Sequence, residues 1–238
     1  MSSLWQTVSE NVVFVLEFLA LIVVMFLIAY VIEKAVKKKN NDTERVLATR
    51  KIVVIGVFSA IAAILMVLEL PVPFAPSFYG LDFSELPALI GAFAYGPVAG
   101  VIICLIKNVL HLFITTTGGV GELSNFLLGA SFVLVAGGVY RFKKTRTGAL
   151  IGSVLGAVLM GLFSIVSNYF LVYPIYYNFM PKEAILSAYQ LIFSGVHNIL
   201  ECLIVFNAPF TCIKGLISVV ITFLIYKRLS PILKGNEE

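Results

Sequence analysis

The sequence is poor in charged residues, which make up only 13% of its 238 positions, whereas 60% of the positions are hydrophobic. So little charge excludes an ordinary soluble domain and is typical of an integral membrane protein. The net charge of +4 does not indicate nucleic-acid binding, because the basic residues lie in short clusters between apolar runs. The length suits six or seven membrane helices packed in one bundle.

Cysteine and histidine are also scarce. The three cysteines all lie in apolar segments: Cys104, Cys202 and Cys212. We expect buried thiols rather than disulfides. Neither His111 nor His197 has a cysteine or carboxylate three or four residues away, except Glu201, so we expect no metal site. The sequence has no Walker loop, GxSxG or HExxH motif, and no enzyme activity is predicted.

Residues 86–115 form a long apolar run that is interrupted by Gly96-Pro97. One helix of about 30 residues would be roughly 45 Å long, too long for a hydrocarbon core of about 30 Å. Glycine followed by proline ends or kinks a helix. The sequence therefore predicts two short membrane helices, residues 85–95 and 97–114, that meet at this break.

The distribution of basic residues predicts the topology. Fourteen of the 17 Lys and Arg residues fall in three clusters, within residues 33–51, 141–146 and 227–234. The positive-inside rule places all three in the cytoplasm, so an even number of crossings must separate them. The predicted spans are residues 12–32, 52–68, 85–95, 97–114, 123–140, 149–172 and 209–226. These seven crossings put the N-terminus outside and the C-terminus in the cytoplasm.

Residues 184–206 are apolar and long enough to span, but a crossing there would place the basic C-terminus outside. The segment also contains polar residues: Gln190, His197, Asn198 and Glu201. We predict an amphipathic or re-entrant segment at the outer face. The chain then divides into residues 1–51 with a membrane helix and basic linker, a membrane domain of residues 52–230, and a cytoplasmic tail of residues 231–238.

Small residues form one stripe on the helix predicted for residues 52–68: Gly56, Ser59, Ala60 and Ala63. Their spacing places them on one helix face. Small residues allow close helix approach in lipid. The stripe therefore predicts a helix contact, either with another protein or within the bundle itself.

Several ionisable or polar residues lie inside predicted spans, where such groups usually pair or face a cavity. Lys107 is expected to make a structural pair, with Glu122 as one candidate. Asn168 and Lys214 fall in the outer halves of their helices. Lys214 needs a partner or access to water, and Glu85 and Asp82 are both candidates.

Short motifs in a specific order carry a family resemblance. They are LDFSELPALIGAFAYGPVAG from Leu81, IKN from Ile106, SNYF from Ser167, IKG from Ile213 and ITFLIYKRLSP from Ile221. Together they resemble the riboflavin-specific substrate-binding subunits of energy-coupling-factor (ECF) vitamin transporters. The resemblance covers about residues 50–233, which leaves the helix of residues 12–32 outside the pattern.

The resemblance implies an all-α, six-helix subunit in the bacterial plasma membrane, here with one additional N-terminal membrane helix. Such a subunit captures its vitamin on the outer face and has no ATPase activity of its own. It works with a transmembrane coupling protein and two cytoplasmic ATPases. Riboflavin would be the transported ligand, and no cofactor is expected.

The resemblance also implies the site residues. Flavin contacts map to Leu81 and Glu85 in LDFSELP, Asn168 in SNYF, and Lys214 in IKG. Thr211 stands three residues before this lysine, where the family often has asparagine. The small-residue stripe maps to the surface that meets the coupling protein.

Three other functions stay open from the residues alone. The same architecture can bind another vitamin. An ion-coupled secondary carrier would be favoured by inverted repeats with ionisable residues at the midplane, and we find no such repeats. A membrane enzyme would need a nucleophile, a metal or an acid–base pair, and none is convincing.

Overall fold

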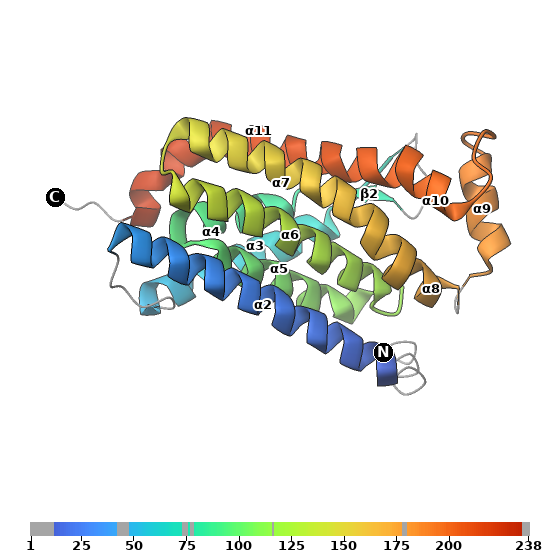
Figure 1. Ribbon diagram of the computed structural model, residues 1–238, viewed down its shortest axis with the longest axis horizontal. Helices are drawn as coiled ribbons and strands as arrows, with labels where there is room; N and C mark the ends of the chain where they lie inside the picture. The colour runs from blue at the N-terminus through green and yellow to red at the C-terminus, as the bar shows by residue number, and fades with distance from the viewer. Residues whose placement is uncertain are drawn as a thin grey trace.

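A computed structural model of the protein describes residues 12–41, 48–72, 76, 79–115, 117–177 and 180–234, apart from the side chains of 12–15, 17 and 227–234. The helices are α2 (Val12–Asn40), α3 (Thr49–Val67), α4 (Glu85–Tyr95), α5 (Pro97–His111), α6 (Val120–Phe142), α7 (Arg146–Ser167), α8 (Tyr173–Tyr176), α9 (Lys182–Gln190), α10 (Ile199–Cys202) and α11 (Ala208–Lys234). They form one elongated bundle (Figure 1).

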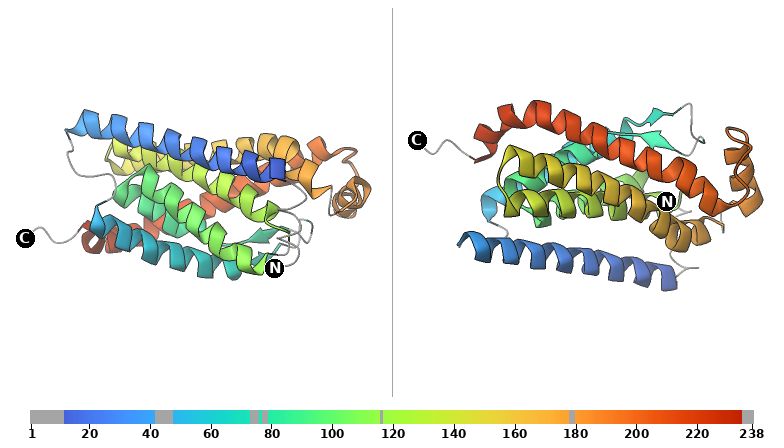
Figure 2. Two further views of the ribbon diagram at one scale, coloured as in Figure 1. Left: turned by 90° about the horizontal axis from the view of Figure 1, so that it is seen from below. Right: turned by 45° about the horizontal axis from the view of Figure 1, so that its top comes forward.

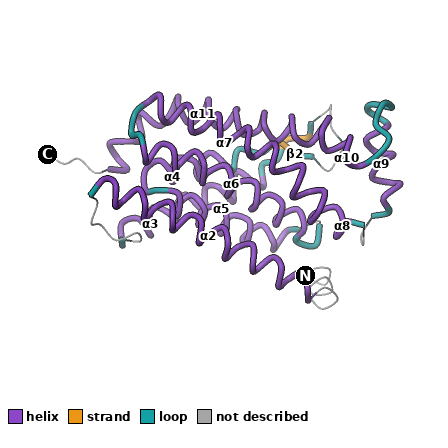
Figure 3. The backbone as a smooth tube through the Cα atoms, in the orientation of Figure 1, coloured by secondary structure: helices purple, strands orange, loops and turns teal. Residues whose placement is uncertain are grey.

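Six helical segments in the described part of the chain are long and apolar enough to cross a membrane: Phe18–Asn40, Thr49–Val67, Pro97–Ile114, Val120–Phe142, Arg146–Tyr176 and Ile199–Tyr226. The predicted all-α membrane bundle is confirmed. Its small addition is an antiparallel pair of short strands, β1 (Leu70–Pro71) and β2 (Gly80–Leu81), shown in orange in Figure 3.

The short helix α4 occupies the middle of the bundle. It packs against α3, α5, α6 and α11, and Ala88, Leu89 and Ala92 are fully buried. Gly96 ends α4 with a φ of 105°, a left-handed conformation that favours glycine. Pro97 then begins α5, where its missing N–H costs no helical hydrogen bond. The predicted break at Gly96-Pro97 is confirmed.

The described parts of the three basic clusters lie at one end of the bundle. The C-terminal end of α2 with the start of α3, the turn from α6 to α7 and the C-terminal end of α11 all lie at this end, whereas α9 and the β1–β2 pair lie toward the other (Figure 1). We call them the basic end and the hairpin end. The helices therefore return to the same end between successive clusters, as the predicted even number of crossings requires.

The N-terminal helix α2 flanks the bundle (Figure 2). It packs against α5 and α6, and it continues to Asn40. The prediction ended this helix at residue 32 and assigned a polar linker from residue 33. That boundary was wrong, because Glu33 and Val36 are buried against the bundle and extend the packed face past the apolar run.

The last long helix begins earlier than predicted. It starts at Ile199, passes through a π-helical segment η3 (Leu203–Asn207) and continues as α11. Residues 184–206 are thus divided between the short helix α9 near the hairpin end and the start of this long helix. A start at residue 209 was wrong, because Pro209 follows a π-turn inside the helix, where the irregular hydrogen bonding accommodates it.

A side-chain cap marks the true start of the last helix. The side chain of Asn198 accepts a hydrogen bond from the Glu201 N–H at 2.9 Å, which satisfies an amide that the first helical turn leaves free. Glu201 Oε2 accepts one from the His197 N–H, just before the cap, at 2.6 Å. Of the polar residues that suggested an amphipathic segment, Asn198 and Glu201 therefore form a helix cap, whereas Gln190 donates to the backbone oxygen of Val196 at 2.9 Å.

Candidate functional site

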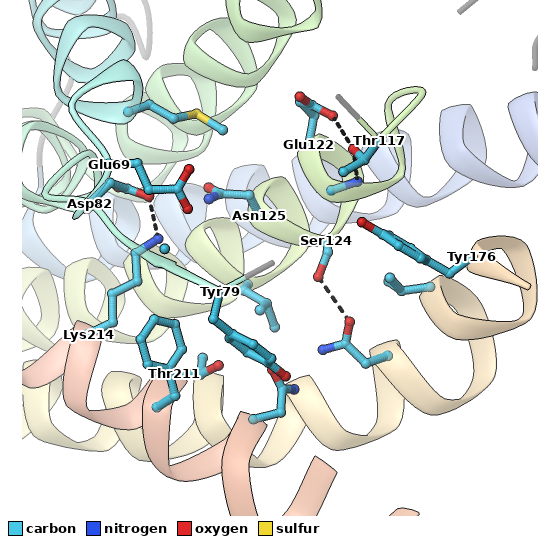
Figure 4. Close-up of a pocket in the computed structure, with 18 of the residues that line it drawn as sticks. Glu69, Tyr79, Asp82, Thr117, Glu122, Ser124, Asn125, Tyr176, Thr211 and Lys214 are labelled. Carbon is cyan, nitrogen blue, oxygen red and sulfur yellow. Dashed lines mark hydrogen bonds and ion pairs between the residues drawn. The ribbon is translucent and has the colours of Figure 1, made fainter. Parts of the chain in front are cut away.

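A cavity of about 540 Å³ is lined in part by residues of the β1–β2 pair, which lies toward the hairpin end of the bundle. Its walls come from the β1–β2 region, α4, α6, α7 with η2 (Asn168–Val172), η3 and α11 (Figure 4). Of the residues predicted to bind ligand, four line it: Glu85, Asn168, Thr211 and Lys214. Leu81 is not among the lining residues, although its neighbours Gly80 and Asp82 are.

Lys214 forms an ion pair with Asp82 across the cavity wall. The Lys214 Nζ to Asp82 Oδ2 distance is 2.7 Å, and Asp82 is only 4% exposed. Asp82 Oδ1 also accepts the Ser84 N–H at 2.8 Å. Burial opposes ionisation of Asp82, but the charges of Lys214 and Lys107 and these hydrogen bonds outweigh it and lower its pKa to about 2. This pair ties the last helix to the segment that precedes α4.

Glu85 is paired with a different lysine. Lys107 on α5 donates to Glu85 Oε1 at 2.7 Å and to Ser84 Oγ at 2.6 Å, and both charged side chains are almost fully buried. Gly129 on α6 makes room for this pair, since a Cβ there would lie 2.5 Å from Glu85 Oε2. A buried charge without a partner costs several kcal/mol, so the pair holds α4 and α5 in a fixed register.

Glu122 has a third set of partners. His111 Nδ1 lies 2.8 Å from Glu122 Oε1, and Thr115 and Thr117 donate hydroxyl protons to Oε2 at 2.9 and 3.2 Å. The predicted pairing of Lys107 with Glu122 was therefore wrong. Helix rotation places Lys107 toward α4, whereas His111, one turn further along α5, reaches α6.

Two asparagines stand on π-helical segments that face each other. Asn168 opens η2, and Asn207 ends η3. Each donates from Nδ2 to the backbone oxygen of Ser164, at 2.8 and 3.4 Å. Asn168 Oδ1 also accepts from Ser124 Oγ at 3.2 Å. Single π-turns are rare and are frequent at functional sites, and both of these contribute residues to the cavity wall.

A cluster of tyrosines closes one side of the cavity. The Tyr79 hydroxyl donates to Asn207 Oδ1 at 2.9 Å and lies 2.8 Å from the Tyr189 hydroxyl, which also bonds Tyr173. The Tyr79 ring meets Phe210 edge to face at 5.1 Å. Burial raises the pKa of Tyr79 and of Tyr189, so both hydroxyls stay neutral. The loop before β2, α9 and the last two long helices are thereby joined.

Sequence reasoning missed many of the cavity residues, among them the polar side chains of Glu69, Asn125 and Asn207. Asn207 had a usable signal, because Asn207, Thr211 and Lys214 follow the i, i+4, i+7 spacing of one helix face. Starting the helix at residue 209 hid that signal. Glu69 and Asn125 had none, because neither belongs to the motifs that carry the family resemblance.

The small-residue stripe lies on a different surface. Gly56 and Ala60 are exposed and Ala63 is half-buried, whereas Ser59 is buried and donates to the backbone oxygen of Ile55 at 2.7 Å. A Cβ at Gly56 would meet no atom within 4 Å. Packing inside the bundle therefore accounts for Ser59 and in part for Ala63, but not for Gly56 or Ala60.

Comparisons with known proteins identify the family. The family model described as "ECF transporter, substrate-specific component" matches residues 50–226. The chain is 34% identical to riboflavin transporter RibU of Staphylococcus aureus (strain TCH60) over 78% of this chain and 93% of that protein. It is also 34% identical to riboflavin transporter FmnP of Bacillus subtilis (strain 168), over 76% and 93%.

A solved structure agrees with the sequence comparison. The S component of a bacterial ECF transporter superposes with a TM-score of 0.61 and is 32% identical, covering 78% of this chain and 98% of that chain. Family match, relatives and fold thus point to the same protein class. The chain belongs to the family of substrate-specific components of ECF transporters.

Proposed function

We propose that this protein is the riboflavin-binding subunit of an ECF-type vitamin importer. The observation that carries the proposal is the cavity. Four residues that the family motifs predict to contact flavin converge there, from three helices far apart in sequence. Two relatives that are 34% identical over most of the chain are riboflavin transporters.

The chemistry of the cavity suits a flavin. Its volume of about 540 Å³ lies in the range of small-molecule sites. Met66, Leu128, Met160 and Phe210 offer apolar surface to a flat ring system. One edge of that ring system has two carbonyls and one N–H, so it needs both donors and an acceptor.

Asn168 and Lys214 are the groups that we assign to that edge. Asn168 has an amide that both donates and accepts, and Lys214 donates from a position fixed by Asp82. Thr211, one turn before Lys214, and Glu85 complete the polar contacts on our assignment. For Leu81, only the LDFSELP motif supports its assignment as a flavin contact.

We further propose the orientation and partners. The hairpin end faces outside and the basic end faces the cytoplasm, which puts the N-terminus outside. Residues 52–230 form the six-helix binding domain, residues 1–51 add a membrane helix with its linker, and residues 231–238 form the tail. The exposed part of the small-residue stripe meets a transmembrane coupling protein, which carries the two ATPases.

Flavin binding tests the substrate directly. Purified in detergent from cells supplied with riboflavin, the protein should be yellow and should quench flavin fluorescence at a one-to-one stoichiometry. Lys182→Ala, on the outside of α9, serves as a control that removes a lysine away from the cavity. If the protein does not bind flavin but binds another vitamin, the proposed substrate is wrong and the family membership still holds.

Cysteine labelling tests the orientation. In a background without the native cysteines, single cysteines at Lys39 and Lys144 should be protected from an impermeant thiol reagent in intact cells. A cysteine at Lys182 should react, because α9 lies near the hairpin end. Labelling of Lys144 from outside would reverse the proposed orientation.

A further inference from the structure

Four carboxylates line the cavity, and three of them have a close partner that offsets their charge. Asp82 pairs with Lys214, Glu85 with Lys107, and Glu122 with His111. Within the described part of the chain, no hydrogen bond or ion pair engages the fourth, Glu69. Glu69 is exposed, so its carboxylate is hydrated and accessible to a ligand that enters the cavity.

The local structure directs Glu69 into the cavity. It stands just before β1, whose Pro71 pairs with Gly80 of β2. A Cβ on Gly80 would overlap the Glu69 carboxyl group, so the glycine leaves the space in which this side chain lies. Figure 4 shows Glu69 beside Asp82, with the side chain of Asn125 from α6 directed toward it.

The surroundings of Glu69 accept hydrogen bonds and resist further negative charge. In the described part of the chain, the buried Oδ1 atom of Asn125 also has no hydrogen-bond partner. Two acceptors that line the same cavity suit a ligand that donates from hydroxyl groups. Burial and the nearby Asp82 charge raise the pKa of Glu69, although Lys214 acts in the opposite direction. Another anion beside this group would be disfavoured for the same reasons.

We propose that Glu69 is a specificity-determining residue, which accepts hydrogen bonds from the uncharged polyol chain of a flavin and repels a phosphate monoester on that chain. This inference rests on the proposed flavin ligand and adds the part of the ligand that Glu69 contacts. A phosphate monoester carries between one and two negative charges at neutral pH and adds mainly acceptor oxygens. It therefore conflicts with Glu69 in both charge and hydrogen bonding.

The test compares two flavins on two variants. Dissociation constants for riboflavin and flavin mononucleotide are measured by fluorescence titration for the wild type, Glu69→Gln and Glu183→Gln. Glu183 is an exposed carboxylate on α9 outside the cavity, so its substitution makes the same charge change as a control. Glutamine keeps the shape and one acceptor oxygen of Glu69 while removing its charge.

The two ligands should respond to Glu69→Gln in opposite directions. Flavin mononucleotide should bind more tightly and riboflavin slightly more weakly, so that the ratio of their dissociation constants falls about tenfold, while Glu183→Gln leaves the ratio unchanged. In the wild type, flavin mononucleotide should bind better as salt rises from about 0.01 M to about 1 M, over which the screening length shrinks from about 30 to about 3 Å.

Several results would overturn the assignment. They are a ratio that Glu69→Gln does not change, a parallel loss of both affinities, or a wild type that binds the two flavins equally. The parallel loss would indicate a structural role only. A wild type that binds neither flavin would instead remove the proposed function, and this inference with it.

Discussion

Buried carboxylates have different partners at the two ends of the bundle. Toward the hairpin end, Asp82 and Glu85 are paired with lysines on other helices, and an open cavity remains between them. Toward the basic end, Glu33 of α2 is fully buried and accepts the backbone N–H of Val98 at 3.1 Å. A Cβ on Gly96 would lie 2.7 Å from Glu33 Oε2, so this carboxylate fills the space beside the α4–α5 break.

The comparison distinguishes the elements that form the cavity from α2, which stabilises the bundle. The residues around the cavity belong to the part of the chain that matches the family, residues 50–226, whereas α2 precedes it and supplies no cavity residue. Met25, Ala29, Glu33 and Val36 form the buried face of α2. Asn40 adds a hydrogen bond to the backbone oxygen of Arg141 at 3.3 Å. α2 thus stabilises the α4–α5 break from outside the ligand site.

Removing Lys214 should produce the largest effect on binding. Lys214→Ala takes away the proposed flavin donor and leaves Asp82 buried without its cation, a change that typically costs about 3–5 kcal/mol. Riboflavin affinity should fall about tenfold or more. Asn168→Ala should lower the affinity to a similar extent without exposing an ion. Isothermal titration of both variants measures this effect.

A double variant distinguishes the lost donor from the unpaired charge. Lys214→Ala with Asp82→Asn removes both charges, so its thermal stability should recover toward that of the wild type while riboflavin affinity stays low. If Lys214→Ala and Asn168→Ala both bind riboflavin as the wild type does, the ligand site lies elsewhere.

Substitution of Glu33 at the basic end should affect thermal stability more than riboflavin binding. Glu33→Ala leaves the Val98 N–H without its acceptor, which typically costs about 1–3 kcal/mol. Glu33→Gln keeps an acceptor oxygen and should cost less. Thermal unfolding in detergent should rank the wild type, Glu33→Gln and Glu33→Ala in that order. A tenfold loss of riboflavin affinity in a folded Glu33→Ala protein would show that the two ends are coupled.

A bulky side chain on the small-residue stripe should leave riboflavin binding intact and stop riboflavin transport. α2 packs against α5 and α6, so it leaves the exposed face of α3 available to another protein. Ala60→Trp should retain riboflavin affinity, lose co-purification with the coupling protein and fail in cellular uptake, because close helix contact in lipid requires small residues. Loss of riboflavin affinity together with uptake would instead indicate packing inside the bundle.

The smallest effect on thermal stability is expected when the pH is lowered from 8 to about 5. The pKa of Asp82 is about 2 in the folded protein and lies below its ordinary value of 3.8. A lowered carboxyl pKa stabilises the fold above the ordinary value, and that stabilisation is lost as the pH falls toward the folded value. Thermal stability should therefore show no Asp82-dependent change from pH 8 to about pH 5. Below about pH 4 the wild type should lose stability more steeply than Asp82→Asn.

Much of the fold followed from local patterns. The apolar runs, the Gly96-Pro97 break and the three basic clusters predicted the bundle and the end at which each connection lies, because these features act within one helix or one loop. The family prediction, carried by short motifs, is confirmed by the family match and the relatives. The roles of Glu85, Asn168, Thr211 and Lys214 as ligand contacts stay predictions, although the structure gathers all four around one cavity.

Residue identities and apolar runs already show which side chains carry charge or amide groups and roughly how deep each lies. Which of these groups meet depends on how the helices pack. Lys214 pairs with Asp82, 132 positions away, while Lys107 takes Glu85. Glu33 finds an amide 65 positions further on, and Glu69 is left without a partner in the described part of the chain. Pairing depends on the rotation and depth of each helix against its neighbours, and the packing of the whole bundle sets both.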